Sequence, residues 1–187
     1  MSTEQAELRA RLEARRGGVH GPFQVLLRSP ELGGRLEELS TSCMRDSALP
    51  PRLRELTLLT VARRFDAQHS WLAHVGRGEA AGLDPAALAR LARGEEPGFR
   101  GPDERILHRF VEQLLADHFV DDDTYAAALA EFGERTLIDL VIVTGGFASL
   151  ALVLNTFQVD LPPTAAPPFP DVTGFRRTPR DNAPAAS

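Results

Sequence analysis

The chain has little of several features that would point to a function. It contains a single cysteine, Cys43, among 187 residues, so an intramolecular disulfide is impossible. Its net charge is −5 and its basic residues form no stripe, so we expect no nucleic-acid partner. Residues 1–16 are polar and charged, without the apolar core of a secretory signal, and we therefore expect a cytoplasmic location.

Long hydrophobic runs are also scarce. The longest extends from Leu137 to Leu154 and is interrupted by polar residues and glycines, namely Asp139, Thr144, Gly145, Gly146 and Ser149. We interpret this run as a buried helix and expect no membrane association. No alternating pattern typical of strands competes with the helical spacing, and no internal repeat is detectable at the level of sequence.

What is present fits a globular protein, because 43% of the residues are hydrophobic and 25% are charged. Glycine and proline divide the chain into segments of helical spacing. Helices are predicted at 4–16, from 30 towards 43, at 51–65, at 67–81 with a cap at Asp66, at 85–93, from 102 to about 115, from the caps at 121–123 to about 132, and from about 134 to 157. The expected fold class is therefore all-α, a bundle of about seven or eight helices with the last one central.

The composition changes at residue 160. Seven of the fourteen prolines lie beyond it, so we expect one helical domain over 1–159 and a proline-rich C-terminal tail over 160–187. The tail is either a disordered terminus or an extended arm that lies along the domain or a neighbouring subunit. In the second case Phe169 and Phe175 would anchor it, and Arg176 and Arg177 would meet acidic groups.

Glu55 is the first residue of chemical interest. It shares a predicted helix face with Leu58 and Leu59, and a carboxylate on an apolar face is costly to bury unless it is paired or protonated. Burial would raise its pKa, as a general acid or base near neutral pH requires. The alternative is an exposed glutamate near a helix start, favoured there by the helix dipole.

The following helix adds His74, which shares a face with Ser70 and borders Trp71. His74 could therefore meet a small polar cavity, or it could be a structural histidine whose hydrogen bonds are satisfied. His69 points away from His74 on an ideal helix, so the pair is a poor metal site. We expect no metal and no cofactor.

The spacing of these residues resembles a known family. In alkylhydroperoxidase D proteins a glutamate is followed by a cysteine after eleven intervening residues, by a second cysteine after two more, and by a histidine after three more. Here those four positions hold Glu55, Ala67, Ser70 and His74. The histidine that the family has between its two cysteines falls on His69. The segments LPPRLRE (49–55), QHSWLAH (68–74) and AGL (81–83) also resemble the longer carboxymuconolactone decarboxylase-like members. The resemblance covers roughly 22–162.

The resemblance implies a helical fold, assembly into dimers, trimers or hexamers, and a small-molecule substrate. It does not carry over thiol peroxidase activity, because Ala67 and Ser70 replace both redox cysteines. What remains fits a cofactor-independent lyase or isomerase that acts on a small organic acid or lactone. Glu55, His74 and His69 would be its catalytic residues, and Ser70, Trp71 and Arg63 would bind the substrate.

Two alternatives stay open. The first is a non-catalytic binding or structural protein in which the Glu–His pair is only a buried hydrogen bond. The second concerns Arg63, which with Arg64 could simply be the solvated end of a helix. A cavity that reaches both Glu55 and His74 would favour the enzyme, whereas a sealed contact would favour the structural role.

Overall fold

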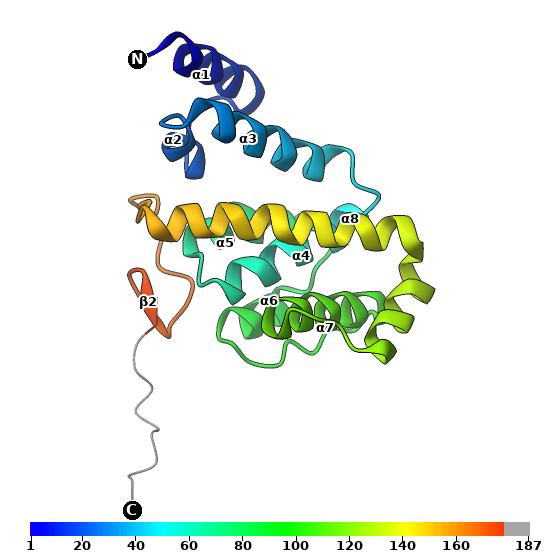
Figure 1. The fold of residues 1–187 in the computed structure, drawn as a ribbon. Coiled ribbons are helices and arrows are strands. Elements are labelled where there is room, and N and C mark those ends of the chain that lie inside the picture. Colours follow the sequence, from blue (N-terminus) through cyan, green and yellow to red (C-terminus); the bar gives the residue numbers. More distant parts are fainter. Residues whose placement is uncertain (178–187) are drawn as a thin grey trace, which may run out of the picture.

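The computed structural model describes residues 1–177, which form eight helices and a two-stranded hairpin (Figure 1). The helices are α1 (Thr3–Arg16), α2 (Pro22–Leu26), α3 (Pro30–Arg45), α4 (Pro51–Arg64), α5 (Gln68–Ala80), α6 (Pro85–Ala92), α7 (Pro102–Asp117) and α8 (Asp122–Thr156). The strands are β1 (Val172–Thr173) and β2 (Arg176–Arg177). The predicted all-α fold class is confirmed.

Local signals explain most helix ends. Ser2 caps α1 by accepting a hydrogen bond from the backbone N–H of Gln5, and the helix ends at Gly17, which is left-handed with a φ of 70°. Asp84 caps α6 by accepting a hydrogen bond from the backbone N–H of Ala86. The short helix α2 was not predicted, because five residues are too few to show a helical period.

The predicted cap at Asp66 is wrong. Ala67 occupies the position before α5 and provides no side-chain cap, while Asp66 has a φ of 54° in the turn after α4. Its carboxylate accepts a hydrogen bond 2.6 Å long from Nη1 of Arg63. The turn is therefore closed by an ion pair with α4 rather than by capping of α5.

α8 lies at the centre of the molecule, as predicted for the last helix. It runs across the middle of Figure 1 and contacts α2, α3, α4, α5 and α7. Gly133, with a φ of 74° and a ψ of 161°, interrupts it at the boundary between the two helices predicted there. By length and composition alone α8 is apolar enough to cross a membrane, but half of its most apolar stretch is buried inside the protein, as in the core helix of a bundle.

The N-terminal helix is attached to α3 by charge as well as by a small apolar cluster. Leu8, Leu12 and Leu27 form that cluster. Beside it, the carboxylate of Glu37 on α3 is fully buried and receives the guanidinium groups of α1, from Arg11, Arg15 and Arg16. A buried carboxylate requires such partners, so these arginines fix how α1 lies on α3.

The described part of the tail lies along the domain. Phe169 is 1% exposed and belongs to the main core, whereas Phe175 is 40% exposed, so only the first of the two predicted anchors is buried. Arg177 pairs with Asp66 and Asp171, 2.7 Å and 3.2 Å from their carboxylates, as expected for an arm that meets acidic groups. The hairpin pairs Val172 with Arg177 in a stretch without proline, which the sequence did not predict. Residues 178–187 of the predicted tail lie outside the described residues.

Candidate active site

Glu55 on α4 and His74 on α5 contact each other, as their spacing predicted. The Oε2 atom of Glu55 lies 2.8 Å from Nδ1 of His74, a hydrogen-bonding distance between two buried side chains. The two helices are brought together because the chain reverses over 65–67 directly after α4. The alternative of a solvent-exposed glutamate at a helix start is wrong, since Glu55 is 4% exposed.

The contact also fixes the histidine ring. With Glu55 ionised, Nδ1 of His74 carries the proton that it donates to the carboxylate, and Nε2 is the nitrogen left to act on a ligand. Phe147 of α8 packs edge-on against the ring, 5.6 Å between centroids, which restricts its rotation. His74 is thus oriented from two sides.

A cavity of about 230 Å³ lies beside His74. Its walls come from the α1–α2 segment, from α3, from α5 and from α8, and the residues that line it are Arg16, Gly18, His20, Gly21, Pro22, Phe23, Ser40, Met44, His69, Ser70, Ala73, His74, Arg77, Phe147, Leu150 and Leu154. The cavity therefore reaches His69, Ser70 and His74 but not Glu55 or Trp71. The expected cavity that reaches both Glu55 and His74 is thus found only in part, because His74 separates Glu55 from it.

His69 and Trp71 have different surroundings. Burial lowers the pKa of His69, and its ring lies under Gly21, where an added Cβ would come within 2.7 Å of the ring. Glycine at this position, with a φ of 58°, lets the α1–α2 segment cover the cavity closely. Trp71 instead packs edge-on against Phe169 of the tail, at 5.3 Å, so its position is structural.

Arg63 is not part of this cavity, and its predicted role as a substrate ligand there is not supported by its position. Its guanidinium donates to Asp66 at 2.6 Å and to both oxygens of Asp171 at 2.8 Å, beneath the Phe169 ring. It is only 5% exposed, so the alternative of a solvated helix end is wrong as well. Arg63 ties the tail to the end of α4.

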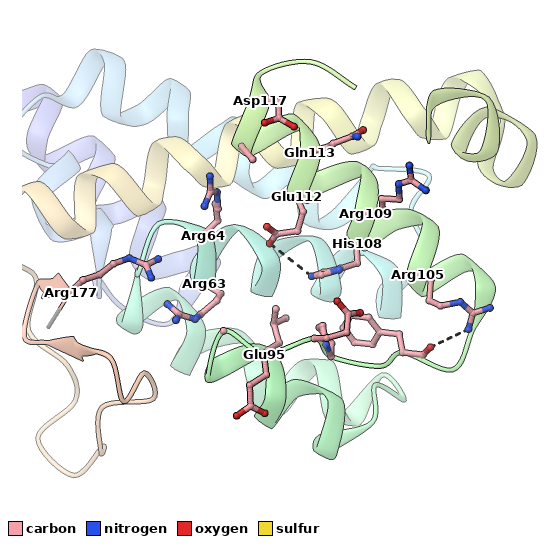
Figure 2. Close-up of a pocket in the computed structure, with 16 residues that line it drawn as sticks. Arg63, Arg64, Glu95, Arg105, His108, Arg109, Glu112, Gln113, Asp117 and Arg177 are labelled. Atoms are coloured by element: carbon pink, nitrogen blue, oxygen red, sulfur yellow. Dashed lines mark hydrogen bonds and ion pairs between the residues drawn. The ribbon is translucent and has the colours of Figure 1, made fainter. Parts of the chain in front are cut away.

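Arg63 also lines a larger cleft of about 730 Å³ between α4, the loop after α6 and α7 (Figure 2). There His108 and Glu112 point toward each other, 3.9 Å apart; burial lowers the pKa of the first and raises that of the second. Arg105 on this wall already donates to backbone carbonyls, and Arg109 pairs with Asp121. Sequence reasoning missed this cleft, although His108 and Glu112 are spaced as neighbours on one helix face.

Sequence reasoning also missed three basic residues of the His74 cavity, Arg16, His20 and Arg77. The first two come from the N-terminal segment, and nothing local in the sequence shows that this segment folds over α5. Within residues 1–177 no cluster of three or more histidine, cysteine or acidic side chains is placed to hold a metal ion.

Comparison with known proteins supports the fold. No protein-family model matches the chain, and no curated protein sequence matches it. A crystal structure of a protein of unknown function from Agrobacterium tumefaciens, with a suggested role as the antioxidant defence protein AhpD, is similar with a TM-score of 0.64. The similarity covers 71% of this chain and 92% of that one at 17% sequence identity. The chain therefore has the all-helical fold of this AhpD-like protein, which confirms at the level of fold the resemblance indicated by its Glu55–His74 spacing.

Proposed function

We propose that the chain is a cofactor-independent acid–base enzyme, a lyase or isomerase like the carboxymuconolactone decarboxylases, and that its substrate is a small organic acid or lactone. One observation carries the proposal: His74, oriented by the buried Glu55, lines a cavity of about 230 Å³. A histidine held in one tautomer beside an enclosed space is suited to proton transfer. His74 is the catalytic residue in this proposal, and Glu55 is a positioning residue because it does not line the cavity.

The chemistry requires only a proton and an electron sink. In a decarboxylation, the bond to the leaving carboxylate breaks, carbon dioxide departs, and the electron pair passes into a conjugated carbonyl of the substrate to give an enolate. Nε2 of the protonated His74 then delivers a proton to the carbon. The carboxylate of Glu55 at Nδ1 stabilises the imidazolium before that transfer. In an isomerisation, the same nitrogen removes a proton from one carbon and returns it to another.

Thiol peroxidase activity is not proposed. Ala67 and Ser70 stand at the two positions where a dithiol would be needed, and neither can form a disulfide. Cys43 is buried on α3, does not line the His74 cavity, and has its pKa raised by burial. A buried thiol with a raised pKa is a poor nucleophile.

A non-catalytic binding protein is the second candidate. It is favoured by the position of Glu55, which is sealed behind His74 as in an ordinary structural hydrogen bond. The cavity would then hold a ligand without converting it, and His74 would serve only as a hydrogen-bonding group.

The test is conversion in deuterated buffer. Unsaturated lactone acids and 3-oxo acids are incubated with the protein and followed by proton NMR, which detects both carbon dioxide loss and deuterium incorporation at carbon. We expect conversion that His74→Asn abolishes and Glu55→Gln reduces. His118→Asn is the matched control, since His118 is an exposed residue at the end of α7 and asparagine tolerates its left-handed backbone. Conversion retained by H74N, or no conversion of any compound, would contradict the proposal.

We also propose that the chain forms a homo-oligomer. Ile138, Val141, Ile142 and Leu152 recur along one side of α8, and each is at least 43% exposed. Apolar surface gathered at helical spacing is typical of an interface between subunits. Light scattering should give a mass above 20.4 kDa for the natural chain, and Ile142→Glu should lower it. A monomer mass for the unaltered protein would contradict the oligomer.

A further inference from the structure

The His74 cavity has an unusual charge composition. Its lining contains five ionisable residues, Arg16, His20, His69, His74 and Arg77, and all of them are basic. The lining contains no aspartate or glutamate, although the chain as a whole carries a net charge of −5. A cavity whose ionisable lining residues are all basic favours the binding of an anion.

Arg16 of α1 is held rigidly at the edge of this cavity. Its Nε donates to Oε1 of Glu37 at 3.3 Å, and its Nη2 donates to the hydroxyls of Ser40 and Thr41 at 3.0 Å and 2.9 Å. Its guanidinium also lies over the ring of Phe23, 4.0 Å from the centroid. Within residues 1–177 its Nη1 makes no hydrogen bond, so this one nitrogen of a preorganised donor group remains for a ligand.

The other basic residues differ in what they can supply. Arg77 on α5 is exposed and forms no ion pair within the described part of the chain. Burial lowers the pKa of His69, which is therefore neutral at neutral pH and acts as a hydrogen-bonding group. The fixed positive charge of the cavity thus comes from Arg16 and Arg77.

The remaining wall of the cavity is apolar, formed mainly by Phe23, Met44, Phe147, Leu150 and Leu154. We infer that the cavity binds a small carboxylate with a compact apolar body, and that Arg16 is the residue that binds the carboxylate. A carboxylate joined to an apolar body can accept from the free Nη1 of Arg16 and also pack against this wall, whereas an inorganic anion can do only the first. The N-terminal helix is then a part of the ligand site, although it lies outside the region, 22–162, that resembles the decarboxylase family.

This inference rests on the proposed function for the location of the site and for the class of ligand, and its role for Arg16 is tested by binding. Benzoate and its neutral analogue benzamide are titrated into the full-length protein by calorimetry. We expect benzoate to bind more tightly than benzamide, and Arg16→Gln to weaken benzoate binding by roughly tenfold or more while benzamide binding is unchanged.

Arg15→Gln is the matched control. Arg15 also pairs with Glu37, 3.2 Å from Oε2, but it does not line the cavity, so its loss tests whether the effect comes only from the Glu37 cluster. Arg16→Lys keeps the charge without the planar group and should give an intermediate affinity if R16Q proves unstable. Each variant's melting temperature is measured alongside.

Several outcomes would overturn the inference. They are equal binding of benzoate and benzamide, no benzoate binding by the natural chain, equal losses in R16Q and R15Q, or inorganic phosphate that displaces benzoate and binds more tightly. Binding and conversion separate the two proposals. A protein that binds benzoate through Arg16 but converts no acid contradicts only the proposed function, whereas unimpaired conversion of acids by R16Q contradicts only the role of Arg16.

Discussion

Replacing Phe169 with alanine should destabilise the whole domain, although the residue lies in the proline-rich tail. Its ring is 1% exposed and packs edge-on against Trp71, at 5.3 Å, with the Arg63 guanidinium 4.8 Å from its centroid. Truncating a buried phenylalanine costs about 3–5 kcal/mol, through lost burial and through the cavity that remains. We expect the lower end, about 3 kcal/mol, because a two-stranded hairpin can partly collapse into the space.

For a chain of this length, that loss lowers the melting temperature by roughly 6–12 °C. Phe175→Ala is the matched control, because Phe175 lies six residues away in the same tail and is 40% exposed. Its truncation should cost less than about 1 kcal/mol. Urea unfolding of the full-length protein, followed by far-ultraviolet circular dichroism, measures both variants. Equal and small losses for the two would refute the conclusion that Phe169 belongs to the domain core.

Four further predictions concern single residues. Glu55→Gln should shift the ring-nitrogen resonances of His74 in NMR spectra, because a neutral amide replaces the carboxylate that accepts from Nδ1; unchanged resonances would show that the two side chains are not coupled. Gly133→Ala should cost about 1–3 kcal/mol in urea unfolding, since alanine is strained at a φ of 74° and ψ of 161°, and a neutral effect would mean that α8 straightens instead. Burial lowers the pKa of His108, so the unfolded chain binds a proton there at a higher pH than the folded chain does, and the free energy of unfolding should fall as the pH drops below about 6.5. His108→Gln should reduce that loss of stability. An identical pH profile for the variant would contradict this assignment. Finally, no alkyl hydroperoxide should be reduced with dithiols, and steady turnover abolished by Cys43→Ser would reveal a one-cysteine mechanism.

Local signals in the sequence predicted most of the fold. Gly17 ends α1 because it adopts a left-handed conformation, and Gly133 separates two helical segments because it adopts an extended conformation with positive φ that favours glycine. Such signals act within one or two turns of the chain, so the sequence displays them directly. The Glu55–His74 contact was predictable because both helices adjoin one short turn.

The remaining parts depend on contacts between distant segments. Arg16 reaches the cavity because its ion pair with Glu37 holds α1 against α3. No periodic pattern in the sequence indicates that contact. Arg63 was predicted to bind substrate or face solvent, yet it is paired with Asp171, 108 residues further along the chain. Long-range ion pairs of this kind follow from the folded arrangement and not from spacing along the sequence.

The contact between Trp71 and Phe169 provides an internal optical probe. Trp71 is the single tryptophan of the chain, so all tryptophan fluorescence of the protein comes from one known position. That indole is buried against the tail while its neighbour in sequence, Ser70, lines the His74 cavity. Departure of the tail would expose the indole to water and shift its emission to longer wavelength, so detachment of this segment can be followed without any label.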